Sequence, residues 1–189
     1  MTLGTSCLRA SLFNLRQGAE WLIFHSVRDS MLNFRSKIIP YESLSTWRET
    51  HRNTGRLVVT NGCFDLLHLG HVTYLETARN LGDELLVGVN SDASVRALKG
   101  ESRPLNSEDD RAAVLAALEA VTFVCVFPDV RAAQFLVRSR PDIYAKGGDY
   151  TLETLDQEER KTVETHHGVI HLIPFVPGKS TTGLLQKIR

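Results

Sequence analysis

The sequence predicts an α/β protein with a Rossmann-like parallel sheet of about five strands and helices on both faces of that sheet. Short apolar runs alternate along the chain with helix-like stretches, which is typical of parallel strands joined by right-handed helical crossovers. One run, Glu84–Asn90, is almost continuously apolar, as expected for a strand that is covered on both faces. Unusual polar residues also gather directly after the expected strands.

Local apolar patterns define the elements up to the second strand. The polar segment 31–56 is expected to hold a leading helix over Ser43–His51 that packs on the edge of the sheet. The first strand is expected over Leu57–Asn61, a short apolar run. A helix is expected over His71–Leu81, where apolar residues recur at helical spacing. Glu84–Asn90 then forms the second strand.

The rest of the chain continues this alternation. A loop after Asn90 leads to a helix over Ser107–Leu118, with Ser107 as its N-cap and Asp110 completing a weak capping box. Further strands are expected over Thr122–Val126, Asp142–Lys146 and Val169–Ile173, and further helices over Val130–Ser139, Glu153–His166 and Ser180–Ile188.

Composition limits the classes of function. The 189 residues fit one domain of ordinary size, and 22 Lys and Arg balance 22 Asp and Glu, so nothing indicates a broad nucleic-acid-binding surface. Three widely spaced cysteines, an odd number, favour a reducing compartment over a disulfide framework. No run approaches the roughly 18–20 apolar residues that cross a bilayer, so no membrane span is expected.

The first thirty residues differ from the rest of the chain. Residues 1–30 are rich in arginine relative to acids, and their longest apolar run is too short for the core of a signal peptide. We expect a poorly ordered, dispensable extension there, with a targeting presequence as the alternative. One folded domain is expected over residues 31–189.

The loops after the strands predict a phosphate site. Ligands of open parallel sheets bind beyond the carboxyl ends of the strands. Nearly every unusual polar residue lies in the four loops at those ends, which are Asn61–His71, Asn90–Arg103, Lys146–Tyr150 and Pro174–Thr182. In the first loop His68 and His71 open a helix, and Gly70 leaves the backbone between them accessible. Two imidazoles beside the free amides of a helix start suit an anion such as phosphate.

The segment Thr60–His71, with sequence TNGCFDLLHLGH, resembles the signature of the cytidylyltransferase-like nucleotidyltransferase superfamily. The resemblance implies a Rossmann-like nucleotidyltransferase domain over residues 31–189. It also implies that His68 and His71 bind the nucleotide's phosphates and stabilise the transition state. A zinc site formed by the cysteine, the aspartate and the two histidines of this segment is the alternative, although the paired cysteine spacing of structural zinc sites is missing.

Two further motifs support the resemblance. The triplet Ser180–Thr182 opens the last expected helix and is similar to the serine-threonine motif that grips the triphosphate in the superfamily. The arginine that precedes this motif in some relatives has no counterpart in Phe175–Pro177. Lys99, Arg103 and Arg111 are spaced like the loop that meets the incoming phosphorylated substrate, and the alternative for Arg111 is an ion pair with Glu108 or Glu119.

The motif Lys146–Tyr150, with sequence KGGDY, narrows the family. With Arg103-Pro104 and the Ser-Thr triplet it resembles the adenylyltransferases that make ADP-heptose from D-glycero-β-D-manno-heptose 1-phosphate, and the likeness runs from about Met31 to the C-terminus. It implies ATP as the nucleotide, Mg²⁺ carried by ATP with no metal ligand assigned to the protein, and a cytoplasmic enzyme of lipopolysaccharide core synthesis. It also implies a sugar kinase on a separate chain and suggests a homodimer.

These motifs together define the expected site. Catalytic roles are expected for His68, His71 and Lys99. Nucleotide contacts are expected from Asn61, Gly62, Cys63, Phe64, Gly70, Lys146, Gly147, Gly148, Asp149, Ser180, Thr181 and Thr182. Sugar-phosphate contacts are expected from Asp65, Asn90, Asp92, Arg103 and Arg111. The alternatives are a cytidylyltransferase for glycerol 3-phosphate or another polyol phosphate, and a catalytically silent nucleotide-binding protein.

Overall fold

The computed structural model describes residues 33–52, 54–148, 150–174 and 183. The expected extension over residues 1–30 lies outside the described residues, as does the expected last helix, Ser180–Ile188, apart from Gly183. Within the described part of the chain, no helix is long and apolar enough to span a bilayer.

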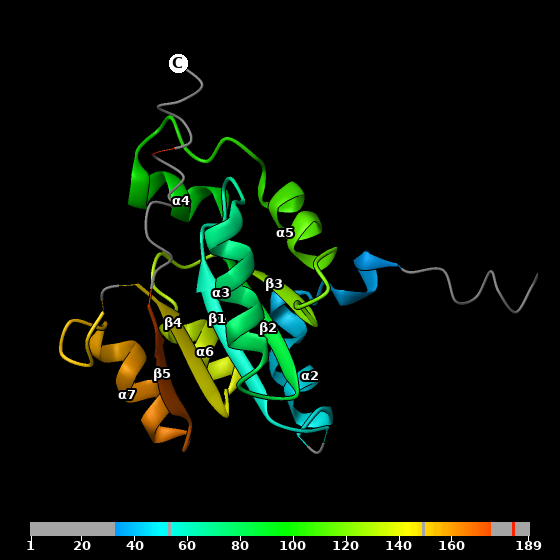
Figure 1. Cartoon of the computed structure of the whole chain (residues 1–189), viewed down its shortest axis with the longest axis vertical. Coiled ribbons are helices and arrows are strands. Elements are labelled where there is room, and N and C mark those ends of the chain that lie inside the picture. The colour runs from blue at the N-terminus through cyan, green and yellow to red at the C-terminus, as the bar shows by residue number, and fades with distance from the viewer. Residues whose placement is uncertain (1–32, 53, 149, 175–182, 184–189) are drawn as a thin grey trace, which may run out of the picture. The chain divides into compact units, whose positions relative to one another are not determined.

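A five-stranded sheet of parallel strands forms the centre of the fold (Figure 1). The strands are β1 (Leu57–Gly62), β2 (Glu84–Asn90), β3 (Phe123–Phe127), β4 (Ile143–Gly147) and β5 (Val169–Ile173). Their spatial order is β3-β2-β1-β4-β5, so the strand order reverses between β1 and β4. The predicted parallel α/β fold is confirmed, and the predicted strand ends agree within one residue. Ligands of such sheets bind beyond the carboxyl ends of the strands, at the reversal point.

All the described α-helices except α4 lie in two layers, one on each face of this sheet (Figure 1). They are α2 (Leu44–Thr50), α3 (Leu69–Arg79), α4 (Asp92–Lys99), α5 (Glu108–Ala116), α6 (Ala133–Ser139) and α7 (Gln157–Thr165), and the 3₁₀ turns η1 (Phe34–Lys37) and η2 (Tyr41–Ser43) precede α2. Helices α3 and α5 cover one face of the sheet, and α2, α6 and α7 cover the other.

Two apolar clusters fill the space between the sheet and these layers. Along β1, Val58 faces the layer of α3 and α5, whereas Val59 faces the layer of α2, α6 and α7, because side chains alternate along a strand. Leu75 of α3 packs in the first cluster and Phe135 of α6 in the second, and both are fully buried. Helices therefore cover both faces, as predicted.

The structure adds a helix where the sequence predicted only a loop. Helix α4 follows Ser91, whose hydroxyl accepts a hydrogen bond from the amide of Ser94, and it ends at Gly100, where φ is +92°. The two residues form a recognisable pair of start and stop signals, a serine N-cap and a C-terminal glycine. Lys99 is the last residue of this helix, so a regular element rather than a free loop holds it.

Two predicted helices begin later than expected, and one predicted N-cap is confirmed. Helix α6 begins at Ala133, and α7 begins after Asp156, whose carboxylate accepts hydrogen bonds from two amides of the first turn. The Ser107 side chain accepts from the amide of Asp110, which makes Ser107 the N-cap of α5 as predicted.

The segment before β1 closes the β3 edge of the sheet. Ile38 forms a parallel bridge with Val124 of β3, and Trp47 of α2 meets the ring of Phe123 edge-on, with centroids 4.8 Å apart. The leading helix therefore reaches the edge strand, as predicted, although its main packing is against α6.

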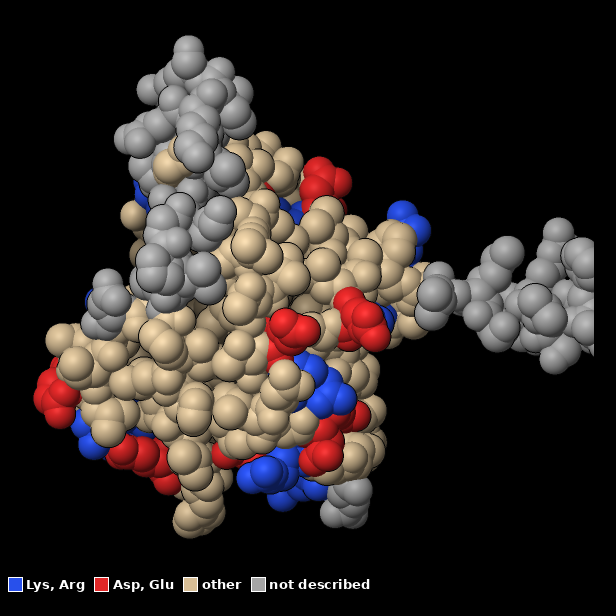
Figure 2. All heavy atoms as spheres, in the orientation of Figure 1, with Lys and Arg blue, Asp and Glu red and all other residues tan. Residues whose placement is uncertain are grey.

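The charged side chains on the face drawn in Figure 2 are of both signs. Acidic and basic groups are interspersed, and most of the surface over α3 is uncharged (Figure 2). On this face the described Lys and Arg residues form no continuous basic patch.

Candidate active site

Two histidines open helix α3 directly after β1. His68 is the N-cap, with an extended backbone (φ −145°), and His71 lies in the first turn. The imidazole rings stack, with centroids 3.9 Å apart and planes inclined by 23°. Phe64 turns the chain ahead of them with φ +46°, and its ring meets the His71 ring edge-on at 5.5 Å. The predicted catalytic pair therefore sits together at a helix N-terminus, where backbone amides favour an anion.

Burial and neighbouring charge keep His71 neutral. Burial, the His68 ring and the Lys99 ammonium lower the pKa of His71 from 6.5 to about 4. Its Nδ1 is buried and has no hydrogen-bond partner among the described residues. A buried N–H without an acceptor is rarer in proteins than a buried acceptor without a donor, so we assign the single proton to Nε2. His71 thus offers a hydrogen-bond donor, rather than a full positive charge, near neutral pH.

A buried carboxylate fastens the loop after α4 to the histidine loop. Asp65 Oδ1 accepts from the amides of Leu105 and Asn106 at 2.8 and 3.1 Å, and Oδ2 pairs with Nε of Arg103 at 2.5 Å. The Asn106 side chain donates back to the carbonyl of Asp65 at 2.7 Å. Arg103 is thereby held beside the histidine loop with 13% of its side chain exposed.

A fully buried arginine joins two of the predicted loops to the segment before α5. Arg111 donates from Nη1 to the carbonyl of Cys63 at 2.6 Å and from Nε to the carbonyl of Asn106 at 3.1 Å. Its Nη2 pairs with Oδ1 of Asp92 at 2.7 Å. Because a guanidinium stays charged, burying it requires such partners. Arg111 therefore sets the relative positions of the loops after β1 and β2 and the start of α5.

Several predicted substrate ligands are bonded to the protein itself. The side chains of Asp65 and Arg111 are buried and ion-paired, an arrangement that suits positioning of the loops, and their direct contact with the sugar phosphate stays a prediction. The partner of Arg111 is Asp92, and not Glu108 or Glu119. Asn90 is also buried, and its amide donates to carbonyls of the loop after β3.

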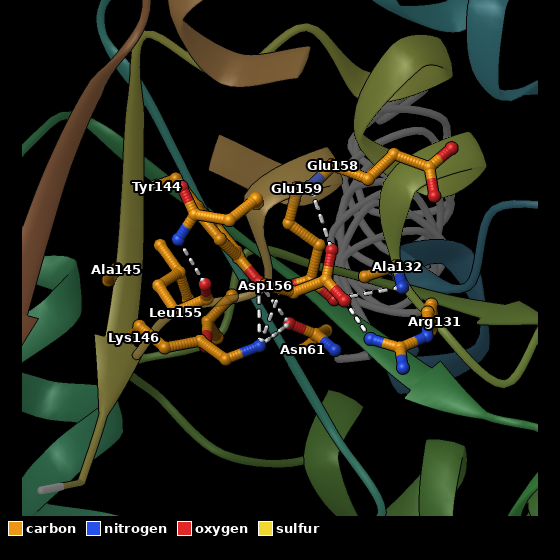
Figure 3. Close-up of polar contacts among 12 residues, drawn as sticks. Asn61, Arg131, Ala132, Tyr144, Ala145, Lys146, Leu155, Asp156, Glu158 and Glu159 are labelled. Atoms are coloured by element: carbon orange, nitrogen blue, oxygen red, sulfur yellow. Dashed lines mark hydrogen bonds and ion pairs between the residues drawn. The ribbon is translucent and has the colours of Figure 1, made fainter. Parts of the chain in front are cut away.

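Lys146, at the carboxyl end of β4, lies in a cluster of protein acceptors (Figure 3). Its Nζ is 3.2 Å from Asn61 Oδ1, 2.8 Å from the Tyr144 hydroxyl and 3.0 Å from Glu159 Oε2. Burial acts to raise the pKa of Glu159, but the Lys146 charge and the hydrogen bonds to the carboxylate outweigh it and lower that pKa. Burial and the Glu159 charge raise the pKa of Tyr144 well above 10, so Tyr144 keeps its proton.

Sequence reasoning missed Tyr144 and Glu159. A signal existed for Tyr144, because residues two apart on a strand share a face and Lys146 follows it by two. Glu159 carries no comparable signal, since it reaches Lys146 from a helix whose start the sequence placed four residues too early.

Local geometry explains why glycine follows Lys146 at positions 147 and 148. A Cβ on Gly147 would lie 2.7 Å from the ring of Tyr74, so only glycine fits there without a shift. The Tyr74 hydroxyl donates to the carbonyl of Ala145 at 3.0 Å, which fixes that ring. Gly148 has φ +134°, a conformation that favours glycine.

The remaining predicted nucleotide ligands are only partly described. Gly62 and Cys63 lie at the end of β1 and just after it, and Gly70 lies in the first turn of α3; all three are half-buried. The other predicted ligands lie outside the described residues, namely Asp149, Ser180, Thr181 and Thr182.

The described residues offer no metal centre. Among them, no group of three or more His, Cys, Asp or Glu side chains is arranged to hold a metal ion. The zinc interpretation of the loop after β1 is therefore wrong: the carboxylate of Asp65 is already bound by Arg103 and two amides.

Comparison with known proteins matches this sequence to a family. The sequence fits the model of the cytidylyltransferase-like family over residues 59–184. It is 51% identical over 179 residues to the bifunctional protein HldE of Syntrophotalea carbinolica, which covers 94% of this chain and 35% of the relative. It is 50% identical over 154 residues to the bifunctional protein HldE of Trichlorobacter lovleyi, covering 81% of this chain and 31% of the relative. The chain thus spans about a third of the length of these relatives.

Solved structures show the same fold. The lipopolysaccharide core biosynthesis protein from Thermoplasma volcanium matches with a TM-score of 0.53 and 27% identity, over 65% of this chain and 97% of that one. The pantoate-β-alanine ligase from Francisella tularensis matches with a TM-score of 0.50 and 13% identity, over 72% of this chain and 66% of that one, and so bears on the fold alone.

Proposed function

The chain belongs to the cytidylyltransferase-like family, and on that premise we propose that it transfers AMP from ATP to D-glycero-β-D-manno-heptose 1-phosphate, giving ADP-heptose and pyrophosphate. The stacked pair His68 and His71 at the start of α3 carries the proposal, because two imidazoles at a helix N-terminus suit a phosphate group. Relatives named bifunctional protein HldE and the solved lipopolysaccharide core biosynthesis protein support the choice of sugar and pathway.

The reaction is a direct in-line displacement. A phosphate oxygen of the sugar phosphate forms a bond to the α-phosphorus of ATP while the bond to the bridging oxygen breaks, and pyrophosphate leaves with that electron pair. Charge grows on the equatorial oxygens of the five-coordinate phosphorus, and N–H donors aimed at them lower the barrier without a covalent intermediate. His68, His71 and the first amides of α3 supply these donors.

The neighbouring residues orient the two anionic reactants. Lys99, exposed at the end of α4, and Arg103, held by Asp65, attract the sugar phosphate. The backbone at Gly62, Cys63 and Gly70, with the Gly147–Gly148 turn, borders the nucleotide. Mg²⁺ carried by the triphosphate would neutralise part of its charge.

Roles for Asp149 and for the hydroxyls of Ser180–Thr182 on the outer phosphates also belong to this proposal. They rest on the motifs alone, because these residues lie outside the described part of the chain. A cytoplasmic location and a homodimer remain predictions of the same kind.

A pyrophosphate-release assay tests the proposal. The purified chain is offered ATP, CTP, GTP and UTP, each with heptose 1-phosphate, glucose 1-phosphate and glycerol 3-phosphate. Release only with ATP and heptose 1-phosphate is the expected result. Release with CTP and glycerol 3-phosphate would identify a polyol-phosphate cytidylyltransferase, and nucleotide binding without turnover would identify a silent binding protein.

A histidine substitution tests the mechanism in the same assay. His71→Ala removes a donor to the transition state and is expected to lower kcat about 100- to 1000-fold. His171→Ala is the matched control, because His171 is exposed on β5 outside the predicted site. An unchanged kcat for His71→Ala would remove this histidine from the mechanism.

A further inference from the structure

The contacts of the Lys146 ammonium leave it no donor for a ligand. An ammonium group has three N–H donors, and Asn61, Tyr144 and Glu159 present three acceptors within 3.2 Å. The Glu159 carboxylate also neutralises its charge, and only 14% of the lysine side chain is exposed. A phosphate contact through Lys146 would require this cluster to break. The cluster instead indicates a role for Lys146 within the protein.

Glu159 is held at both of its carboxylate oxygens. Oε1 accepts from the amide of Ala132, at the start of α6, at 3.0 Å. Oε2 lies 2.8 Å from the Tyr144 hydroxyl and 3.0 Å from Lys146 Nζ. The Glu159 side chain is 6% exposed and Tyr144 is fully buried. Glu159 is therefore a rigid anchor that joins α7, α6 and β4.

This anchor fixes the amide of Asn61 in one orientation. Asn61 Oδ1 lies 2.7 Å from the Tyr144 hydroxyl and 3.2 Å from Lys146 Nζ. Reversing the amide would turn its N–H₂ donors against the ammonium donors. The nitrogen Nδ2 points away from Lys146 (Figure 3) and has no hydrogen-bond partner among the described residues.

Asn61 occupies the position where such a donor is useful. It is the penultimate residue of β1, next to β4, where the strand order of the sheet reverses. The loop that leads to the two histidines begins directly after this strand. Ligands of parallel sheets bind at this point.

We propose that Glu159 and Tyr144 are positioning residues that act through Lys146 to hold the Asn61 amide with its N–H₂ group facing the bound nucleotide. Asn61 then donates a hydrogen bond to an acceptor atom of that nucleotide, and Lys146 makes no direct contact with it. This inference rests on the proposed nucleotide binding and adds two residues to it that no motif indicates.

Calorimetric titration with ATP and Mg²⁺, in the absence of any sugar phosphate, measures the affinity for ATP without turnover. Asn61→Ala is expected to weaken ATP binding about two- to tenfold, the usual range for one lost hydrogen bond. Glu159→Gln is expected to weaken it similarly, because the carboxylate no longer holds Lys146. Glu158→Gln is the matched control: the same change on an adjacent exposed residue, which points away from the cluster in Figure 3 and is expected to leave the Kd unchanged.

The double variant separates positioning from general stability. If Glu159 acts through Asn61, Glu159→Gln in the Asn61→Ala background costs no further affinity, whereas independent effects multiply. Tyr144→Phe removes only the central hydroxyl, so it tests the same link if Glu159→Gln fails to fold. Kd values and thermal melts are recorded for each variant.

Three results would overturn the inference. Tighter ATP binding by Glu159→Gln would reveal Lys146 as a restrained phosphate ligand. Multiplicative effects on the Kd in the double variant, or absence of ATP binding by the unaltered chain, would also contradict it. Failure of the proposed function is a separate outcome. It would appear as normal ATP binding, with the expected variant pattern, but no pyrophosphate release with any sugar phosphate.

Discussion

The buried position of His71 predicts a loss of stability in mild acid. Burial and the nearby His68 and Lys99 lower its pKa from 6.5 to about 4 in the folded protein. Between these two pH values His71 is mostly protonated in the unfolded chain and mostly neutral in the folded chain. The free energy of unfolding therefore falls as the pH drops below about 6.5, and this loss is complete once the pH passes below about 4.

The size of the effect follows from the two pKa values. Without solvent screening, this lowering of the pKa would reduce the free energy of unfolding by about 2 kcal/mol between about pH 7 and about pH 5. His71 is partly exposed, so solvent screens the interaction, and about 1 kcal/mol is the expected contribution.

Urea unfolding of the wild-type chain and of His71→Gln, at both pH values, measures this contribution. Glutamine does not titrate. From about pH 7 to about pH 5 the free energy of unfolding of His71→Gln is therefore expected to fall by about 1 kcal/mol less than that of the wild type. His171→Gln, an exposed position, is the control and is expected to keep the wild-type pH dependence. Equal pH dependence of wild type and His71→Gln would show that His71 titrates normally, and the neutral-donor role would lose its basis.

The site contacts yield further predictions. Arg111→Met leaves the Asp92 carboxylate and two carbonyls without their donor and is expected to destabilise the fold by about 3–5 kcal/mol in urea unfolding, whereas the exposed Arg96→Met is expected to change little. Asp65→Asn weakens the hold on the loop after α4 and is expected to raise KM for the sugar phosphate more than it raises KM for ATP; the reverse ratio would argue against this role. Gly147→Ala forces a Cβ against the Tyr74 ring and is expected to cost about 1–3 kcal/mol, and thermal melts indistinguishable from wild type would contradict the steric reading.

The sheet and the histidine pair were predictable because their signals are local. The apolar runs define each strand, and the alternation with helices dictates parallel pairing. Residues three apart at the start of a helix share a face, so the spacing of His68 and His71 already implied that their rings would meet. Ser107 was recognisable as an N-cap for a similar reason, since its partner amide is three residues away.

The parts that were not predictable depend on contacts between distant segments. Nothing in the sequence shows that Arg111 bonds to the carbonyl of Cys63 and to the carboxylate of Asp92. The ion pair between Lys146 and Glu159 was not predictable for the same reason, since Glu159 comes from a neighbouring helix. Helix α4 was missed because it is short and polar, although Ser91 and Gly100 mark its ends.

The central place of β1 has a consequence for synthesis of the chain. Its neighbour β2 follows after a single helix, but the strand that covers its other side, β4, begins about eighty residues later. At typical translation speeds of about 5–20 residues per second, the edge of β1 that pairs with β4 stays unpaired for several seconds during synthesis. An uncovered edge of apolar strand is prone to pair with other chains, so the nascent protein is expected to be most vulnerable to aggregation before β4 emerges.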